Sequence, residues 1–218
     1  MENIKTKIVE LPTFEQLTDK EKEKVIENYY DIIVDCIGWW EFTFEDWQEK
    51  LKKELPFLDD IEIHFSGFYS QGDGASFDAT INNVEFMRWL LKSEKVNHKT
   101  INKICELIEY GEIDFNPTIE KNSYANHYCH HNTRYIEINE IYFDYMDNQK
   151  LKVKYEKLIN NIFDKCEAWI TELYRSYCKE IYQSLSNEYE YLTSEEAIKE
   201  TLISNEYTFN RETLKIDY

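Results

Sequence analysis

The strongest constraint on the fold is a long run of apolar residues at helical spacing between residues 151 and 185. These residues recur every three or four positions: Leu151, Tyr155, Leu158, Ile162, Cys166, Trp169, Leu173, Tyr177, Ile181 and Leu185. Such spacing predicts a long amphipathic helix, which needs an equally long apolar surface to cover it. We expect that surface to be the chain's own sheet, and a coiled coil with a partner is the alternative.

The sheet is predicted from segments in which apolar residues alternate. Residues 61–69 and 75–81 indicate two antiparallel strands, joined by "SQGDG" with the hairpin-forming pair Asp73-Gly74. Further strands are expected at 112–119, 123–131 and 133–143, and Pro117 marks the first of these as an edge strand. A short hairpin is expected at 206–218.

The remaining segments show helical spacing. Helices are expected at 18–36, 43–55, 82–94, 98–111 and 192–204. Thr18 with Glu21, and Thr193 with Glu196, have the spacing of a capping box.

The predicted fold class is α+β, with an antiparallel sheet of about five strands packed against several helices. No linker rich in Gly, Ser or Pro interrupts the chain, so residues 1–218 are interpreted as a single domain. Its parts are a helical N-terminus (14–55), a sheet with inserted helices (61–143), and a long helix, short helix and terminal hairpin (151–218).

The charge of the chain limits its partners. The sequence has 43 Asp and Glu against 25 Lys and Arg, a formal net charge of −18. Such a field repels phosphate backbones, so direct binding to duplex nucleic acid is not expected, whereas basic protein surfaces are attracted. Solubility is the alternative reason for this charge. With no apolar stretch for a membrane or a signal peptide, and five scattered cysteines, we expect a cytoplasmic protein without disulfides.

Three of the five glycines lie within eight residues, at Gly67, Gly72 and Gly74. One interpretation is a tight hairpin turn, which Asp73-Gly74 favours. The other is a ligand site in which successive backbone N–H groups bind an anion. Its candidate residues are Ser70, Gln71, Gly72, Asp73, Gly74 and Arg134. The stretch is neither a P-loop nor a dinucleotide fingerprint, because neither Lys-Ser/Thr nor a helix follows.

The sequence "NHYCHHNTRY" gathers potential metal ligands. On a strand, His127, Cys129 and His131 would face one side, and His64 is the candidate for a fourth zinc ligand. The alternative is that they are ordinary strand side chains, since residues two apart on a strand are about 7 Å apart. No residue is identified that would orient Cys129 as a nucleophile. No catalytic residue is therefore assigned, and the sequence favours a protein that is not an enzyme.

Three blocks carry a resemblance to a known group of proteins: "FSGFYSQGDGASF", the Tyr128-x-His130 segment, and "LTSEEAIKETLISNEYTFN". They resemble a diffuse family of small proteins encoded by phages and mobile elements, mostly of unassigned biochemistry. The resemblance implies a phage setting and a counter-defence role of the anti-CRISPR kind. It assigns no catalytic residue.

These observations favour an acidic inhibitor that binds a basic host protein or ribonucleoprotein, such as a CRISPR nuclease complex. One alternative is a pocket protein or enzyme that acts on a small anionic ligand, such as a nucleotide, at the "SQGDG" hairpin. The other is a plain interaction or structural module.

Overall fold

The fold class follows the sequence prediction. The structure, a computed structural model, describes residues 11–35, 38–93, 98–121, 128–143 and 146–217. It is α+β, with an antiparallel sheet that has four strands rather than about five. The chain divides into two compact units, which we call the sheet unit (residues 42–185) and the terminal unit (residues 1–41 and 186–218). A single domain of residues 1–218 stays a prediction.

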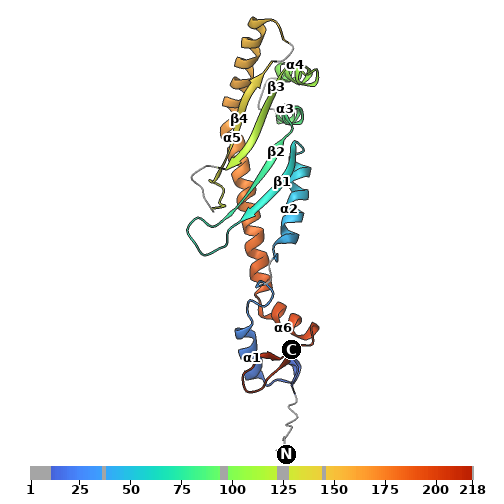
Figure 1. Cartoon of the computed structure of the whole chain (residues 1–218), viewed down its shortest axis with the longest axis vertical. Coiled ribbons are helices and arrows are strands. Elements are labelled where there is room, and N and C mark those ends of the chain that lie inside the picture. The colour runs from blue at the N-terminus through green and yellow to red at the C-terminus, as the bar shows by residue number, and fades with distance from the viewer. Residues whose placement is uncertain (1–10, 36–37, 94–97, 122–127, 144–145, 218) are drawn as a thin grey trace, which may run out of the picture. The chain divides into compact units, whose positions relative to one another are not determined.

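The sheet unit contains the four-stranded sheet and most of the helices (Figure 1). The strands lie in the order of the chain, each antiparallel to the next: β1 (Leu58–Phe65), β2 (Ala75–Ile81), β3 (Asp114–Lys121) and β4 (Arg134–Tyr142). The helices are α2 (Glu41–Glu54), α3 (Asn83–Lys92), α4 (His98–Glu109) and the long α5 (Gln149–Leu192). The last residues of α5 belong to the terminal unit.

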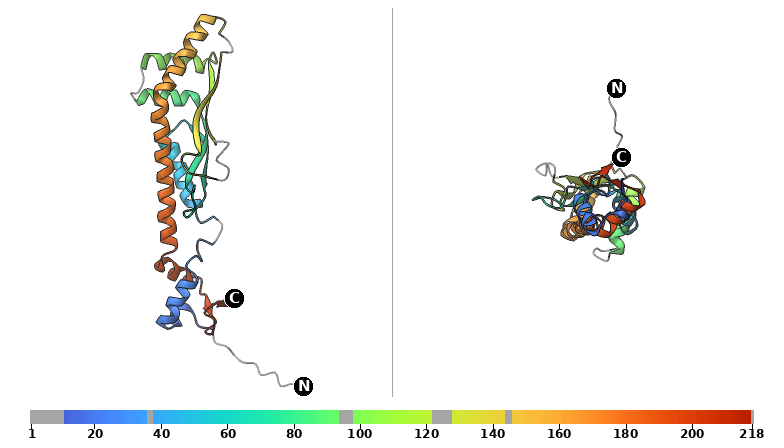
Figure 2. Two further views of the ribbon diagram at one scale, coloured as in Figure 1. Left: turned by 90° about the vertical axis from the view of Figure 1, so that its left-hand side faces the viewer. Right: turned by 90° about the horizontal axis from the view of Figure 1, so that it is seen from below.

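All helices of the sheet unit lie on one face of the sheet, as the left view in Figure 2 shows. α5 packs along this face, which confirms that the sheet covers the long amphipathic helix. The ring of Tyr174 lies 4.8 Å from that of Phe77 on β2, and Phe163 lies 5.7 Å from Phe115 on β3. The two α3 rings Phe86 and Trp89 stack on Phe163 and Trp169 of α5.

The buried line along α5 differs from the predicted one. The residues that α5 buries are Ile159, Ile162, Phe163, Cys166, Ile170, Tyr174, Cys178, Ile181 and Leu185. Leu151 is exposed, while Trp169, Leu173 and Tyr177 are half-buried beside the line. Both sets of residues have helical spacing. Packing against the curved sheet and α3 determines which set is buried.

The backbone pairing between β2 and β3 is much shorter than the pairing between the other neighbouring strands. Only one residue pair, Thr80 with Thr118, is in register there, whereas β1–β2 and β3–β4 pair over most of their lengths. The hydroxyl of Tyr174 replaces a missing strand partner: it donates to the carbonyl of Phe77 at 3.0 Å and accepts from its N–H at 3.4 Å. A side chain of α5 thus satisfies backbone groups that β3 leaves without a ladder bond.

Two strand predictions are wrong in detail. β3 is an inner strand, so Pro117 does not mark an edge. Proline is tolerated because the register shifts between Phe115 and Pro117, and because β2 pairs with β3 only at Thr118. In the predicted strand 123–131, residues 122–127 lie outside the described residues, and 128–133 form a loop and turn closed by a 2.8 Å bond from the Thr133 N–H to the His130 carbonyl.

The terminal unit is formed by both ends of the described chain. It contains a 3₁₀ turn (Phe14–Gln16), α1 (Asp19–Asn28), α6 (Glu195–Ser204) and the predicted hairpin of β5 (Thr208–Phe209) and β6 (Ile216–Asp217). Its core joins Phe14, Leu17 and Val25 to Ile198, Leu202 and Phe209.

The helix ends of the terminal unit refine the capping predictions. Thr18 and Glu21 form the predicted capping box, in which the Thr18 N–H donates to the Glu21 carboxylate at 2.8 Å. α6 is capped one residue later than predicted, by Ser194, whose hydroxyl accepts the Ala197 N–H. α1 ends at Asn28 rather than near residue 36, because Tyr29 packs on Phe209 and its hydroxyl accepts the Ile216 N–H.

Within the described residues, no helix combines the length and the apolar character needed to span a bilayer.

The Tyr174 hydroxyl predicts a measurable loss of stability. Tyr174→Phe leaves the N–H and the carbonyl of Phe77 buried without a partner, which we expect to cost about 1–3 kcal/mol of unfolding free energy. Urea unfolding followed by circular dichroism measures the change. The control is Tyr177→Phe, because the Tyr177 hydroxyl bonds Glu54 at the exposed surface and its loss should cost less than about 0.5 kcal/mol. Equal losses in the two variants would contradict this role.

Candidate functional site

The segment between β1 and β2 is a chain reversal held by its own aspartate. The Asp73 carboxylate accepts the Ser70 N–H at 2.6 Å, and the Asp73 N–H donates to the Ser70 carbonyl at 3.1 Å. Gly67 and Gly72 have φ values of +106° and +94°, which residues with a side chain rarely adopt. Asp73 therefore closes the turn, and one of its oxygens is occupied in doing so.

The glycines also permit close packing against the loop 128–133. A Cβ on Gly74 would lie 2.7 Å from the Cα of His130, and one on Gly72 would overlap the ring of Tyr128. Contacts this short require a residue without a side chain. The concentration of glycine in this stretch thus reflects two loops in direct contact, a contact that the sequence does not reveal.

A cavity of about 190 Å³ lies where these loops meet α5. Its lining residues are Asp73, Gly74, Ala75, His130, His131, Cys178, Lys179 and Tyr182. Of the predicted ligand residues, Asp73 and Gly74 line it, but Ser70, Gln71, Gly72 and Arg134 do not. Ser70 and Gln71 are exposed at the tip of the turn. Lys179 and Tyr182 come from α5, and no pattern in the sequence marks them beyond their place on the long helix.

Arg134 is bound to a carboxylate instead of being available to a ligand. Its side chain is only 2% exposed, and its Nε and Nη2 donate to the two carboxylate oxygens of Asp78 at 2.7 and 3.3 Å. His64 contacts the same carboxylate through Nε2 at 2.8 Å. Strands β1, β2 and β4 are thereby joined through one carboxylate.

This pairing sets the charge state of Asp78. Burial raises the pKa of its carboxyl, but the hydrogen bonds from His64 and Arg134, together with their charges, outweigh burial and lower the pKa to about 2. Asp78 therefore stays ionised at any ordinary pH and neutralises the buried guanidinium of Arg134.

The predicted metal ligands are not brought together within the described residues. His127 lies outside them, Cys129 and His131 are in the loop 128–133 rather than on one strand face, and His64 contacts Asp78. The part of the chain that the structure describes contains no group of three His, Cys, Asp or Glu residues placed to hold a metal ion. The zinc site that includes His127 stays a prediction.

The cysteine thiol in the cavity is not an activated nucleophile. Burial raises the pKa of Cys178 to about 12, so the thiol is protonated at neutral pH.

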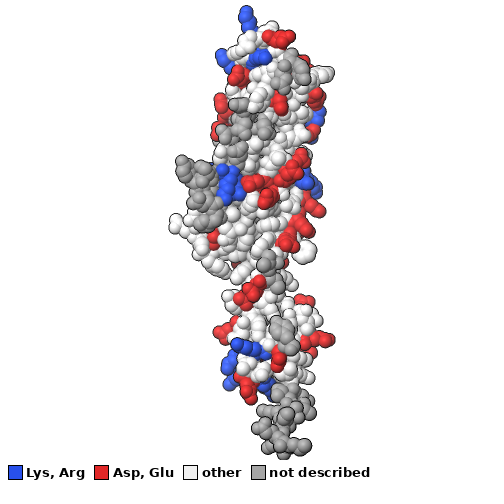
Figure 3. Space-filling view, viewed as in Figure 1, with Lys and Arg blue, Asp and Glu red and all other residues white. Residues whose placement is uncertain are grey.

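An acidic surface lies on α2 and β1, on the side of the sheet unit where Figure 3 shows carboxylates gathered. The two elements adjoin, because the Gln48 amide of α2 donates to the Ile61 carbonyl of β1 at 2.9 Å. We call the exposed carboxylates there the acidic ridge: Glu45, Asp46, Glu49, Asp59, Asp60 and Glu62. None of the six forms a salt bridge with a lysine or arginine among the described residues, and Glu62 lies 3.9 Å from Nδ1 of His64.

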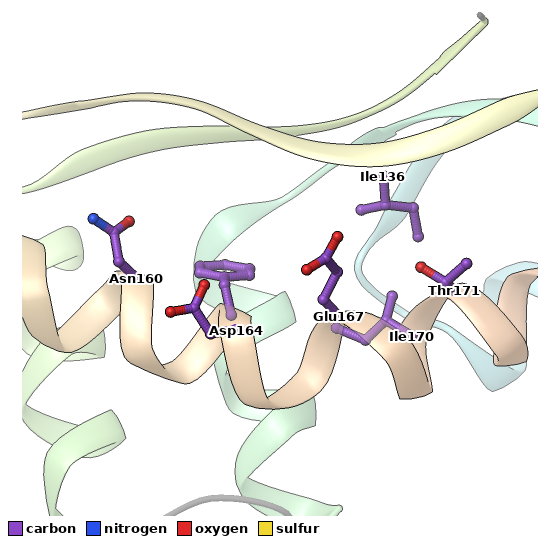
Figure 4. Close-up of a pocket in the computed structure, with 7 residues that line it drawn as sticks. Ile136, Asn160, Asp164, Glu167, Ile170 and Thr171 are labelled. Carbon is purple, nitrogen blue, oxygen red and sulfur yellow. The ribbon is translucent and has the colours of Figure 1, made fainter.

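A second cavity, of about 240 Å³, lies between β4 and α5. Figure 4 shows Asn160, Asp164, Glu167 and Thr171 on the helix side, with Ile136 of β4 facing them. Sequence reasoning missed this cavity because no spacing rule aligns residues of β4 with residues of α5.

The comparisons with known proteins identify a family. A family model described as a domain of unknown function (DUF8835) matches residues 39–195. The chain belongs to this family. The match covers the sheet unit, with both described loops of the site, and leaves out most of the terminal unit. No curated protein matches the chain. No solved structure matches it either.

The lowered pKa of Asp78 predicts a pH-dependent stability difference. An unfolded aspartate has a pKa near 3.9, so the ion pair's contribution is complete above about pH 4 and is lost as the pH falls toward 2. Asp78→Asn should therefore be clearly less stable than the natural chain at about pH 6, and the gap should narrow by about pH 3. Urea midpoints of both proteins at the two pH values measure it. A gap that does not change with pH would show that the carboxylate charge is not what stabilises this site.

Proposed function

We propose that the protein binds a basic, nucleic-acid-binding host protein through the acidic ridge and thereby inhibits it. The observation that supports this is the set of six exposed carboxylates on α2 and β1 without lysine or arginine partners among the described residues. In a protein selected only for solubility, carboxylates and lysines would be interspersed. The lysines of α2 lie instead in its last turns, and Lys50 is paired with Glu180 of α5.

A surface of this kind is attracted to grooves that normally hold phosphate backbones. The sequence resemblance implies a phage or mobile-element setting, and in that setting the expected targets are host defence proteins. Within the proposal, the partner is a defence effector of the host cytoplasm, such as a CRISPR nuclease complex, and inhibition follows from occupation of its nucleic-acid groove. No chemistry on the partner is required, so the protein acts by binding.

The acidic ridge predicts how inhibition responds to charge. The double variant Asp59→Asn/Glu62→Gln keeps the shape of the ridge but removes two of its charges. We expect it to bind a susceptible CRISPR nuclease ribonucleoprotein at least about tenfold more weakly, and to lose inhibition of DNA cleavage in proportion. Competition with fluorescent target DNA, followed by anisotropy over a panel of such complexes at low and high salt, measures this.

The matched control removes two charges from α6, with Glu196→Gln/Glu200→Gln, and should change binding less than about twofold. Failure of the natural chain to associate with any basic nucleic-acid-binding protein of the panel at low salt would refute the proposed function. Equal losses from the ridge and the α6 variants would show that only the total charge matters.

A second candidate function is the binding of a small anion in the cavity between the "SQGDG" turn and the loop 128–133. Lys179 lines this cavity and forms no salt bridge with any residue that the structure describes. Burial lowers the pKa of His131, and the positive charges of Lys179 and Arg175 lower it further, while Glu172 acts in the opposite direction. Two cationic side chains of α5 therefore lie near this cavity. Asp73 also lines the cavity, and its negative charge disfavours highly charged anions.

A thermal-shift screen with inorganic phosphate and nucleoside monophosphates tests this second function. A ligand in this cavity should raise the melting temperature of the natural chain, and Lys179→Met should abolish the rise. Lys165→Met, at another exposed lysine of α5, should leave the rise unchanged. Absence of any shift at millimolar ligand would exclude this candidate for those anions.

A further inference from the structure

The cavity between β4 and α5 combines an apolar interior with a polar rim. Its lining residues are Ile136, Asn160, Phe163, Asp164, Glu167, Ile170 and Thr171 (Figure 4). Phe163 and Ile170 are at least nine-tenths buried and form the apolar part together with Ile136. The ring of Phe163 is held between those of Phe86 and Phe115, each 5.7 Å away, so packing within the sheet unit fixes this wall of the cavity.

The rim carries two carboxylates on one face of α5. Asp164 and Glu167 are three residues apart, so they are neighbours on the helix surface, and like charges at this spacing destabilise each other. Both are exposed, and neither forms a salt bridge with any described lysine or arginine. A cation placed between them would relieve this repulsion.

The size and chemistry of the cavity suit one long basic side chain. Its volume of about 240 Å³ is below the roughly 300–1,000 Å³ of clefts that hold drug-sized ligands. Lysine and arginine bury an aliphatic stem on apolar surface while the charged end stays at a polar rim. Arginine fits best, because its guanidinium has five donors in a fixed fork and the rim offers two carboxylates with the Asn160 amide and the Thr171 hydroxyl.

The cavity adjoins β4, which is an edge strand of the sheet in the part of the chain that the structure describes. β4 is the last strand in the order β1-β2-β3-β4, and no other strand of the described residues pairs with it. An extended segment of another protein can add to such an edge through backbone hydrogen bonds, while alternate side chains enter pockets beside it. Side chains of an added strand that point to the helix-covered face would be directed toward α5, on which the carboxylates of the cavity lie.

We propose that the β4 edge and this cavity bind an extended segment of a basic protein partner, with one arginine side chain in the cavity between Asp164 and Glu167. The inference rests on the proposed function for the basic character of the partner. It places a second contact at the opposite edge of the sheet from the acidic ridge, and it names the recognised group.

A synthetic peptide tests the inference without the partner. The probe is a fluorescein-labelled, end-capped seven-residue peptide of alternating threonine and valine with a single central arginine. Its match carries citrulline, which has the same shape without the charge. We expect the natural chain to bind the arginine peptide about tenfold more tightly, which corresponds to a difference of about 1.4 kcal/mol. Anisotropy titration at low salt gives both affinities.

Two variants of α5 locate the binding. Glu167→Gln should reduce the affinity for the arginine peptide by about tenfold and leave that for the citrulline peptide unchanged. Glu156→Gln removes the same charge from another exposed position of α5 and should change neither. Thermal melts of both variants confirm that each is folded. Equal affinities for the two peptides, or equal effects of the two variants, would overturn the inference.

Two further outcomes separate this inference from its alternatives. If sedimentation shows that the chain forms dimers that the arginine peptide does not dissociate, a second copy occupies the β4 edge and the inference is wrong. If the nuclease complexes bind the chain and only the acidic-ridge variant reduces their affinity, the proposed function is supported and this second contact is wrong. If the peptide binds as expected but no nuclease complex does, the cavity recognises arginine and the proposed function fails.

Discussion

The carboxylate of Asp78 is the contact on which the arrangement of the sheet unit depends. It receives a nearly buried guanidinium from β4 and an imidazole from β1, while itself belonging to β2. The ladder between β2 and β3 has a single pair in register, so backbone hydrogen bonding alone holds the two halves of the sheet weakly. The ion pair and the Tyr174 hydroxyl therefore supply the cohesion that a continuous ladder supplies in an ordinary sheet. A buried charge without its partner is costly, so this contact also enforces one strand arrangement.

The same contact explains why the glycine-rich turn is where it is. Arg134 is the first residue of β4, and the loop 128–133 that leads into it packs on Gly72 and Gly74. The positions of the turn, of the loop 128–133 and of the Arg134 guanidinium therefore depend on one another. The cavity next to them is a by-product of this packing in which Lys179 and two imidazoles are exposed to a common space. The functions proposed for the acidic ridge and for the β4 cavity use elements that this packing holds in place.

Periodicity in the sequence was sufficient to predict the kind of most elements. The alternation at 75–81 and the helical spacing of 151–185 each reflect a single buried face, which is a local property. What could not be predicted depends on contacts between distant segments. The sequence predicts a ligand-binding role for Arg134 because nothing in it reveals the ion pair with Asp78, 56 residues away. It predicts an edge position for Pro117 because the weak β2–β3 pairing leaves no pattern in the sequence. Which residues of α5 are buried depends on contacts with α3 and the sheet.

The terminal unit has a consequence for the order of events on the ribosome. Pro12 and Thr13 bond to β5, and Tyr29 bonds to β6, so α1 shares its core with residues that are translated after the whole sheet unit. All residues of the sheet unit emerge between these two halves. Phe14, Leu17 and Val25 therefore cannot be buried in their core until α6 and the hairpin of β5 and β6 have been translated. During synthesis these apolar side chains stay exposed to water, and exposed apolar surface of this kind makes an incompletely translated chain prone to aggregation.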